Sequence, residues 1–291
     1  MTALLIAVGA ILGLLVGSFL NVVVYRVPNR KSIVSPPSAC PGCGVAIRPY
    51  DNIPVLSWLV LRGRCRSCRT RISVRYPLVE LGTAVFFAVV TWVVLGGAVP
   101  TNSTDEITSG NGFGGVVAGA SVASVALVLV AFLYLAAISV ALALIDLDTH
   151  KLPNAIVLPS YLVGAVLLAA AALLDGDLDA LLRAGIGMAV LFLLYLLMAL
   201  AYPGGMGLGD VKLAGVLGLF LGFLGWGPLV VGAFAAFLLG GLFGMLLLAS
   251  KRANRKSGIP FGPWMLVGAW VGVFFGTAVW RGYLTLVGLA W

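Results

Sequence analysis

The feature that most constrains this chain is a series of long apolar runs. Apolar residues make up 61% of the 291 residues and charged residues 10%. A helix needs about 20 apolar residues to cross a bilayer, and many of these runs reach that length. We therefore predict an all-α polytopic membrane protein with about eight transmembrane helices. The predicted spans are about 2–24, 77–99, 115–145, 155–174, 181–202, 211–225, 228–249 and 263–289.

The first apolar run could in principle be a signal peptide. It has no basic segment before it, is long enough to span a membrane, and continues directly to Arg26. We therefore interpret residues 1–25 as a retained first transmembrane helix.

Basic residues predict which way the chain crosses the membrane. Ten of the eighteen lysines and arginines lie between Arg26 and Arg75, and four more lie in 251–256. With eight spans these two loops share one side, which the positive-inside rule makes cytoplasmic. The loops 101–112 and 175–179 contain five acidic residues and no basic ones. We predict a multi-pass protein of the cell inner membrane, with both termini outside.

Four cysteines form two close pairs within the first basic loop. Cys40 and Cys43 are separated by two residues, as are Cys65 and Cys68, and 21 residues lie between the pairs. Paired knuckles of this kind supply four thiolates to a tetrahedral Zn²⁺ ion, and an all-cysteine site is typically structural. We predict a cytoplasmic zinc-ribbon-like loop; a redox pair or inert thiols are the alternatives.

The same loop, residues 26–76, is strongly basic. A basic zinc ribbon can bind nucleic acid. Basic residues beside a membrane more often contact anionic lipid headgroups and set topology, so we expect membrane lipid and no nucleic acid as the partner. The chain then divides into the first helix (1–25), the cysteine loop (26–76) and a membrane-embedded domain (77–291).

Two aspartates border apolar spans on the predicted cytoplasmic side. Asp146 follows the third span, and Asp210 begins the sixth span after the glycine-rich stretch "PGGMGLG". The simplest interpretation makes Asp210 a helix N-cap and Asp146 an interfacial charge. Acidic residues within apolar segments are costly, however, and are functional candidates by default.

Two carboxylates brought together share one proton and titrate as a unit. Such a pair activates a water molecule and protonates a leaving amine, as in aspartic proteases. From the helix dipoles we expect Asp210 to stay ionised as the base and Asp146 to hold the proton.

Four motifs, in order, resemble the type IV prepilin peptidases, aspartic proteases of the GxGD class. They are "GSFLNVVVYRVP" (17–28), the cysteine loop with "ISVRYPLVEL" (72–81), "ALIDLDTHKLPN" (143–154) and "GMGLGDVKL" (205–213). The resemblance covers nearly the whole chain.

This resemblance implies specific roles for residues of the last two motifs. Asp146 matches the first catalytic aspartate, with Asp148 as a weaker rival, and Asp210 matches the second. Gly207, Gly209 and Lys212 belong to the loop expected around the second aspartate.

The resemblance also implies the reaction. The enzyme would cleave the short basic leader from type IV prepilins or pseudopilins at the cytoplasmic face. Many members also methylate the new terminal amine with S-adenosyl-L-methionine, an activity associated with the cysteine loop. No glycine-rich nucleotide fingerprint places the methyl donor, which leaves Asp51 and Glu80 as the acids considered for it. Arg69 stands where the family commonly has glycine, which predicts a less regular second knuckle.

Two other classes of function remain as alternatives. A proton-coupled transporter would use Asp146 and Asp210 as a relay, and would place them near the bilayer midplane within internal repeats. A non-enzymatic scaffold would use the zinc loop to bind partners, but it gives no reason for a glycine-flanked aspartate at a span end.

Overall fold

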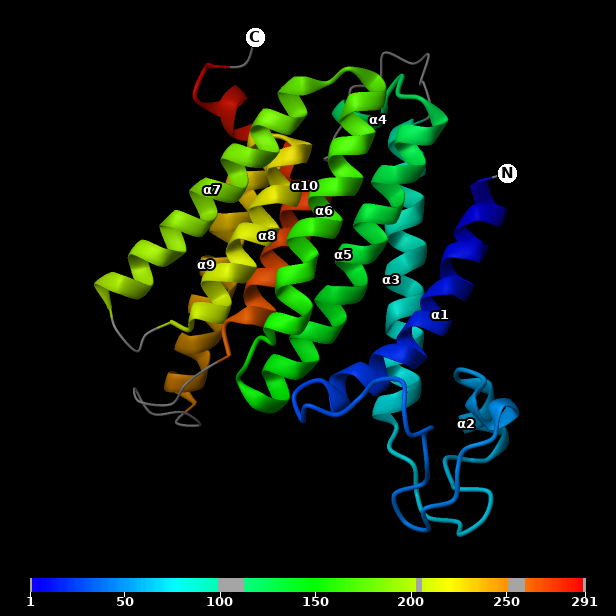
Figure 1. Cartoon of the computed structure of the whole chain (residues 1–291). Coiled ribbons are helices and arrows are strands. Elements are labelled where there is room, and N and C mark those ends of the chain that lie inside the picture. The colour runs from blue at the N-terminus through cyan, green and yellow to red at the C-terminus, as the bar shows by residue number, and fades with distance from the viewer. Residues whose placement is uncertain (1, 99–112, 203–205, 251–259, 290–291) are drawn as a thin grey trace.

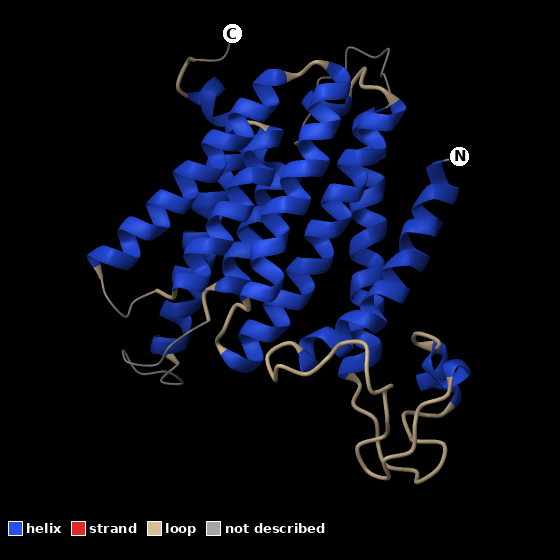
Figure 2. Ribbon diagram, viewed as in Figure 1, coloured by secondary structure: helices blue, strands red, loops and turns tan. Residues whose placement is uncertain are grey.

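The structure is a computed structural model, and it describes residues 2–98, 113–202, 206–250 and 260–289. These residues form helices and loops without a named strand (Figure 2). Three elements are short: η1 (Pro49–Asn52), α2 (Leu56–Val60) and α4 (Gly114–Val117). The long helices are α1 (Thr2–Arg26), α3 (Arg75–Ala98), α5 (Val122–Thr149), α6 (Asn154–Asp175), α7 (Leu178–Ala201), α8 (Leu208–Leu224), α9 (Trp226–Ala249) and α10 (Gly262–Leu286).

Seven of the described long helices are long and apolar enough to cross a membrane, which confirms a multi-pass membrane protein. The exception is α8, which at 17 residues spans only about 26 Å. It packs against α6, α7, α9 and α10, and every residue from Leu213 to Leu224 is buried. The predicted sixth span is therefore an interior helix, enclosed by the others.

The start of the third span was predicted wrongly. Sequence hydropathy placed it at residue 115, but α5 begins at Val122 and is preceded by the separate short helix α4. Gly119 takes a positive φ of 77° and breaks the helix. The Ser121 side chain then accepts a hydrogen bond from the Ser124 backbone N–H at 3.2 Å and caps α5. Hydropathy alone cannot register such a break because alanine, glycine and serine remain compatible with a span.

Glycines bring three helix pairs into close contact. On α1, Gly9, Gly13 and Gly17 recur every four residues and face α3. A Cβ at Gly218 of α8 would lie 2.2 Å from the Gly187 carbonyl oxygen of α7. On α10 a Cβ at Gly268 would lie 2.4 Å from a backbone nitrogen of α9. Small residues at such spacing let helix backbones approach closely inside a membrane.

Both ends of the chain lie at one end of the bundle. Figure 1 shows that α1 begins and α10 ends there, whereas the cysteine module, which we define as residues 27–74, extends beyond the opposite end. We call that opposite end the module end. The basic stretch 251–256 and the acidic loop 101–112, which contributed to the predicted orientation, lie outside the described residues.

Candidate active site and cysteine cluster

Asp146 lies in the last turn of α5, at the module end, and is only 5% exposed. Its Oδ2 accepts a hydrogen bond from the Gly262 backbone N–H at 3.1 Å. Gly262 is the first residue of α10, and a Cβ there would lie 2.7 Å from the same oxygen. The carboxylate therefore lies against the amino terminus of α10, where free N–H groups and the helix dipole stabilise a negative charge.

An aromatic cluster fixes the start of α10. The Phe261 ring packs against the rings of Phe237 on α9 and Tyr195 on α7, with centroids 5.6 and 6.4 Å apart. The adjoining Gly262 N–H is thereby held in place toward Asp146. Gly262 was not among the residues predicted for the site, and its only signal in the sequence is a glycine between Phe261 and a proline at a predicted span start.

Asp210 is the third residue of α8, and Gly207 occupies the N-cap position that the simplest sequence interpretation gave to Asp210. The Asp210 Oδ2 accepts a hydrogen bond from the Gly207 backbone N–H at 3.1 Å. The Asp210 N–H in turn donates to the Gly207 carbonyl at 3.0 Å. The glycine cap has no side chain, so the carboxylate alone provides side-chain capping and remains partly exposed.

The two aspartates flank one side chain, Leu152, in the turn between α5 and α6. A Cβ at Gly209 would lie 3.0 Å from the Leu152 Cβ, and a Cβ at Gly262 would lie 3.4 Å from Leu152 Cδ2. Neither Gly207 nor Gly209 takes a positive φ. Gly209 thus matters for close approach of α8 to this turn. Leu152 therefore lies beside both Gly209, which precedes Asp210, and Gly262, which donates to Asp146.

Lys212 and Asp148, the other candidates from these two motifs, connect neighbouring helices around the site. Lys212 donates from Nζ to the Asn154 Oδ1 at 3.1 Å, and its carbonyl accepts from the Tyr161 hydroxyl at 2.6 Å, so it ties α8 to α6. Asp148 pairs with Arg75 at the start of α3, with N–O distances of 3.0 and 2.6 Å. Asp148 therefore has Arg75 as its cationic partner.

An apolar cavity of about 350 Å³ lies between α3, α5 and α10. Its floor on α5 includes Ala143, one turn before Asp146, and its α10 side includes Pro263, next to Gly262. The walls meet where Phe86 and Trp270 pack edge to face, with ring centroids 4.5 Å apart. One end of the cavity therefore reaches the residues that hold Asp146.

The four cysteines converge, as their spacing predicts. The sulfur atoms all lie within 4.8 Å of one another, and those of Cys40 and Cys68 are 3.7 Å apart. Ligands about 2.3 Å from a tetrahedral zinc ion are separated by about 3.8 Å. The cluster therefore fits a metal ion of the zinc type.

The four thiols differ in how readily they ionise without a metal ion. Hydrogen bonds from the Thr70 side chain and backbone lower the pKa of the Cys68 thiol to about 6. The Val45 N–H lowers the pKa of Cys43, but the neighbouring sulfurs and burial outweigh it and raise that pKa to about 11. Crowded thiols ionise unequally on their own, and a bound cation lets all four act as thiolates.

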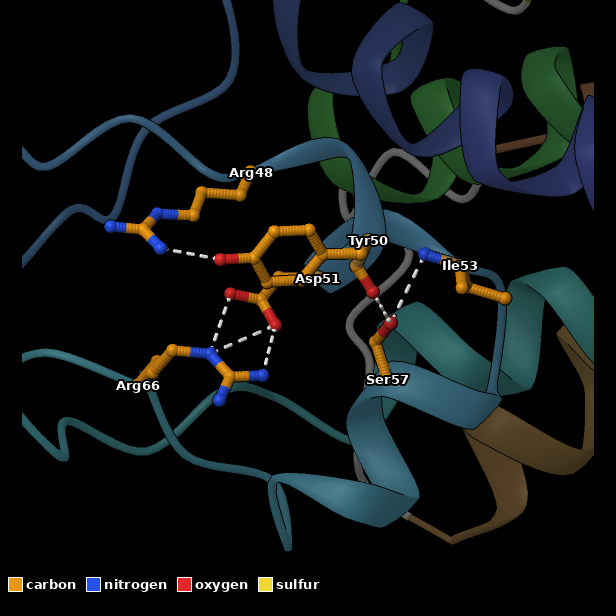
Figure 3. Close-up of polar contacts among 6 residues, drawn as sticks. All are labelled: Arg48, Tyr50, Asp51, Ile53, Ser57 and Arg66. Carbon is orange, nitrogen blue, oxygen red and sulfur yellow. Dashed lines mark hydrogen bonds and ion pairs between the residues drawn. The ribbon is translucent and has the colours of Figure 1, made fainter.

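Asp51 belongs to the framework of the cysteine module. Its carboxylate receives paired hydrogen bonds from Arg66, with Nε at 2.9 Å from Oδ2 (Figure 3). The same hydrogen bonds hold the pKa of Asp51 below its usual range. Ser57 donates to the Tyr50 carbonyl and accepts from the Ile53 N–H, both at 3.0 Å. Asp51 is thus paired with Arg66 within the module.

The second knuckle is as regular as the first, contrary to the expectation from Arg69. Arg69 takes φ of 63°, close to the 69° of Gly44 at the matching position. Gly44 and Arg69 donate to the Cys40 and Cys65 carbonyls at 2.8 and 3.1 Å. The arginine therefore adopts the glycine conformation, at a cost in backbone energy.

Comparison with known proteins agrees with this geometry. The Bacterial Peptidase A24 N-terminal domain matches residues 11–94, and the Type IV leader peptidase family matches residues 132–245. The first match contains the cysteine cluster and the second contains both aspartates. No solved structure matches the chain.

Several curated proteins are similar over almost their full length. A protein of Pseudomonas putida is 35% identical over 98% of this chain and 96% of its own length. Proteins of Pseudomonas aeruginosa and Neisseria gonorrhoeae are 34% and 33% identical, over 96% and 95% of this chain and 93% and 92% of their own lengths. Each is named a prepilin leader peptidase/N-methyltransferase. This chain belongs to the type IV leader peptidase family.

Proposed function

We propose that this protein cleaves the leader peptide from type IV prepilins or pseudopilins and N-methylates the new amino terminus. The family and the names of its relatives support both activities. The observation that carries the proposal is that Asp146 and Asp210, borne by separate helices, both adjoin the turn that contains Leu152: Gly262 donates to Asp146, Gly209 precedes Asp210, and Leu152 lies beside both glycines. We assign these two aspartates as the catalytic pair.

The pair has the chemistry for peptide hydrolysis. One carboxylate removes a proton from water as its oxygen attacks the scissile carbonyl, and the protonated partner donates to the carbonyl oxygen. The leaving amine then receives a proton as the carbon–nitrogen bond breaks. Both carboxylates lie at helix amino termini, of α10 and α8, so the dipole argument no longer separates base from acid. We therefore treat the pair as one unit with one proton.

The apolar cavity beside Asp146 supports a prepilin as the substrate. A prepilin carries its basic leader directly before an apolar helix, so the cleavage site must reach the aspartates while that helix stays in an apolar environment. Ala143 and Pro263 place the cavity next to Asp146 and its partner Gly262. We propose that the first turns of the substrate helix occupy this cavity.

The cysteine cluster would hold a structural Zn²⁺ through Cys40, Cys43, Cys65 and Cys68. When bound, the ion supplies folding energy to a module that has little apolar core, and it takes no part in the hydrolysis. We propose S-adenosyl-L-methionine as the methyl donor, on the basis of the relatives' names.

We further propose that the module end faces the cytoplasm and that the termini lie on the other side of the inner membrane. Ten basic residues between Arg26 and Arg75 support this orientation through the positive-inside rule. We also propose that the chain is organised as a first helix (1–25), a cytoplasmic cysteine loop (26–76) and a membrane-embedded peptidase domain (77–291).

The transporter alternative is not supported. A relay would place Asp146 and Asp210 near the bilayer midplane. Asp146 lies in the last turn of α5 and Asp210 in the first turn of α8 instead. The family and its named relatives also point to a peptidase.

The test uses purified full-length protein and a prepilin in detergent, with leader release followed by mass spectrometry. Asp146→Asn and Asp210→Asn keep side-chain shape and remove the titration, so each should lower cleavage by at least about 10⁴-fold. Asp148→Asn, whose aspartate is paired with Arg75, is the matched control and should retain cleavage. Cleavage by both dyad variants at the wild-type rate would rule out the assignment.

A further inference from the structure

Glu80 is a buried carboxylate that the proposed peptidase mechanism does not use. It lies on α3, five residues after Arg75 at the module end, and is only 8% exposed. Asp51 and Asp148 at this end have arginine partners. Among the residues that the structure describes, no lysine or arginine lies within ion-pair distance of Glu80.

One Glu80 oxygen is held by the cysteine module. Oε2 accepts a hydrogen bond from the Val55 backbone N–H at 2.7 Å. Val55 has φ of 60° and ψ of −50°, a conformation that β-branched residues strongly disfavour. Such a residue persists only where the surroundings impose it, and such strain is concentrated at functional sites. The module is therefore docked onto α3 with one N–H directed at the carboxylate.

The second oxygen, Oε1, is available to a ligand. It accepts no hydrogen bond from the described part of the chain, and it is not sealed from solvent. On the α1 side, Gly17 faces Glu80, and a Cβ at that position would lie 2.8 Å from the Glu80 Cα. The helix that passes over Glu80 therefore contributes backbone and no side chain at this point.

Holding Val55 does not explain why the residue is a carboxylate. A neutral glutamine would accept the same N–H hydrogen bond without the cost of a buried charge. An unpaired acid in an apolar helix is a functional candidate, and the partner expected for it is a cation. One carboxylate beside an N–H donor offers too few oxygen ligands for a hard metal ion. An ammonium group, which donates up to three hydrogen bonds, suits the site better.

We propose that Glu80 binds the amino terminus produced by leader cleavage and acts as the base for its methylation; this inference rests on the proposed function. The ammonium group donates to Oε1 and passes one proton to Glu80, which leaves a neutral amine. The amine nitrogen attacks the methyl group of a sulfonium donor. A nitrogen–carbon bond forms, the carbon–sulfur bond breaks, and its electron pair stays on sulfur as a thioether.

The test compares wild type, Glu80→Gln and Asp148→Asn as full-length proteins in detergent. After prepilin cleavage in the presence of S-adenosyl-L-methionine, the methyl mass increment is followed over time. Glu80→Gln keeps an acceptor for Val55 and loses the base, so methylation should fall by at least about 100-fold. Leader cleavage by Glu80→Gln and methylation by Asp148→Asn, whose exposed carboxylate lies outside the module, should stay within about threefold of wild type.

A second measurement separates binding from fold and needs no methyl donor. Two peptides with the mature amino-terminal sequence, one with a free amine and one acetylated, are titrated against each protein. Wild type should prefer the free amine by about tenfold, and Glu80→Gln should lose that preference while its zinc content is unchanged. Glu80→Asp should recover part of the preference.

Several results would overturn the proposal. Methylation by Glu80→Gln at the wild-type rate would show that the negative charge of Glu80 is not needed. An unchanged preference for the free amine would leave Glu80 only a structural role. Loss of prepilin cleavage in Glu80→Gln, with methylation of the mature peptide retained, would assign Glu80 to the basic leader. Failure of wild type to cleave prepilin would instead count against the proposed function.

Discussion

The aspartate site and the cysteine module are held together by different means. Asp146 and Asp210 are positioned by backbone: an N–H of α10, an N–H of the α8 cap, and glycines that let Leu152 pack between them. The module is held by side chains, namely four sulfurs and the paired hydrogen bonds of Asp51 and Arg66. One side-chain link between the module and the bundle is the hydrogen bond from the Val55 N–H to Glu80 on α3.

This difference implies that the two regions fail independently. A membrane bundle with close helix contacts tolerates loss of a peripheral loop, whereas the loop has little core of its own to replace a metal ion. A hydrogen bond to a charged group, such as that from Val55 to Glu80, contributes about 1.5–3 kcal/mol, which is less than the loss of a metal ion costs the module.

Removal of the metal should have the largest effect, because it should affect methylation and not leader cleavage. Zinc binding contributes about 10–16 kcal/mol to small all-protein zinc sites, so the module should unfold without it. We expect chelation, or Cys40→Ser, to abolish methylation while leader cleavage stays within about threefold of wild type. Mass spectrometry of the product reports both activities in one sample, and added zinc should restore the chelated wild type. Parallel loss of cleavage would show that the module is part of the peptidase site.

Gly262→Ala should have the opposite effect to metal removal: it should impair leader cleavage and leave the cysteine module intact. The added Cβ would lie 2.7 Å from the Asp146 Oδ2 and must displace the carboxylate or the start of α10. A displacement of about 1 Å at a catalytic group can lower the rate by about 100-fold, and we expect cleavage to fall by that factor. Zinc content should not change.

The control for Gly262→Ala is Gly241→Ala on α9, where a Cβ meets no other atom within 4 Å. It changes the same residue type in a neighbouring helix and should leave cleavage unaltered. Equal rates for the two variants would mean that the α10 amino terminus does not position Asp146.

The features of the two regions that depend on residue type and spacing could be predicted from the sequence. Hydropathy located the long helices to within a few residues except at the start of α5. The two cysteine pairs predicted a cluster because thiolates at that spacing are typical zinc ligands. The aspartates were found because charge is rare in apolar segments. Their assignment as the catalytic pair stays a prediction until the asparagine variants are measured.

What the sequence could not predict are contacts made by backbone groups. Gly262 donates an N–H to Asp146 across 116 residues, and no side chain signals it. For Asp146 the sequence showed only the carboxyl end of its own helix, whereas the structure places the amino terminus of α10 against the same carboxylate. Glu80 was placed near a span start, but its lack of a cation and its contact with Val55 depend on how the module docks.

Filling the apolar cavity should affect substrate handling rather than chemistry. Ala143→Phe places a ring where we propose that the substrate helix lies, one turn from Asp146. Cleavage of full-length prepilin should fall by about tenfold, since overpacking or displacement of a well-packed helix costs about 1–3 kcal/mol. A short peptide that ends just beyond the cleavage site should be cut at the wild-type rate.

The matched control for the cavity variant is Val85→Phe, which adds a ring of the same size to an exposed position on α3 outside the cavity. It should change neither rate. Equal loss with both prepilin and the short peptide would indicate distortion of the aspartates instead of exclusion of the helix.

The smallest expected effect is a gain of stability in the cysteine module from Arg69→Gly. Arg69 holds φ of 63°, which is unfavourable for a residue with a Cβ, while Gly44 holds the matching position of the first knuckle without strain. Relief of this strain is offset in part by the greater freedom of glycine in the unfolded chain, so we expect a net gain of about 0.5–1 kcal/mol. Competition with a chelator should show zinc retained about two- to fivefold more tightly. Arg69→Ala removes the same charge but keeps the Cβ, so it should show no gain; equal behaviour of the two variants would attribute the effect to charge and not to the backbone.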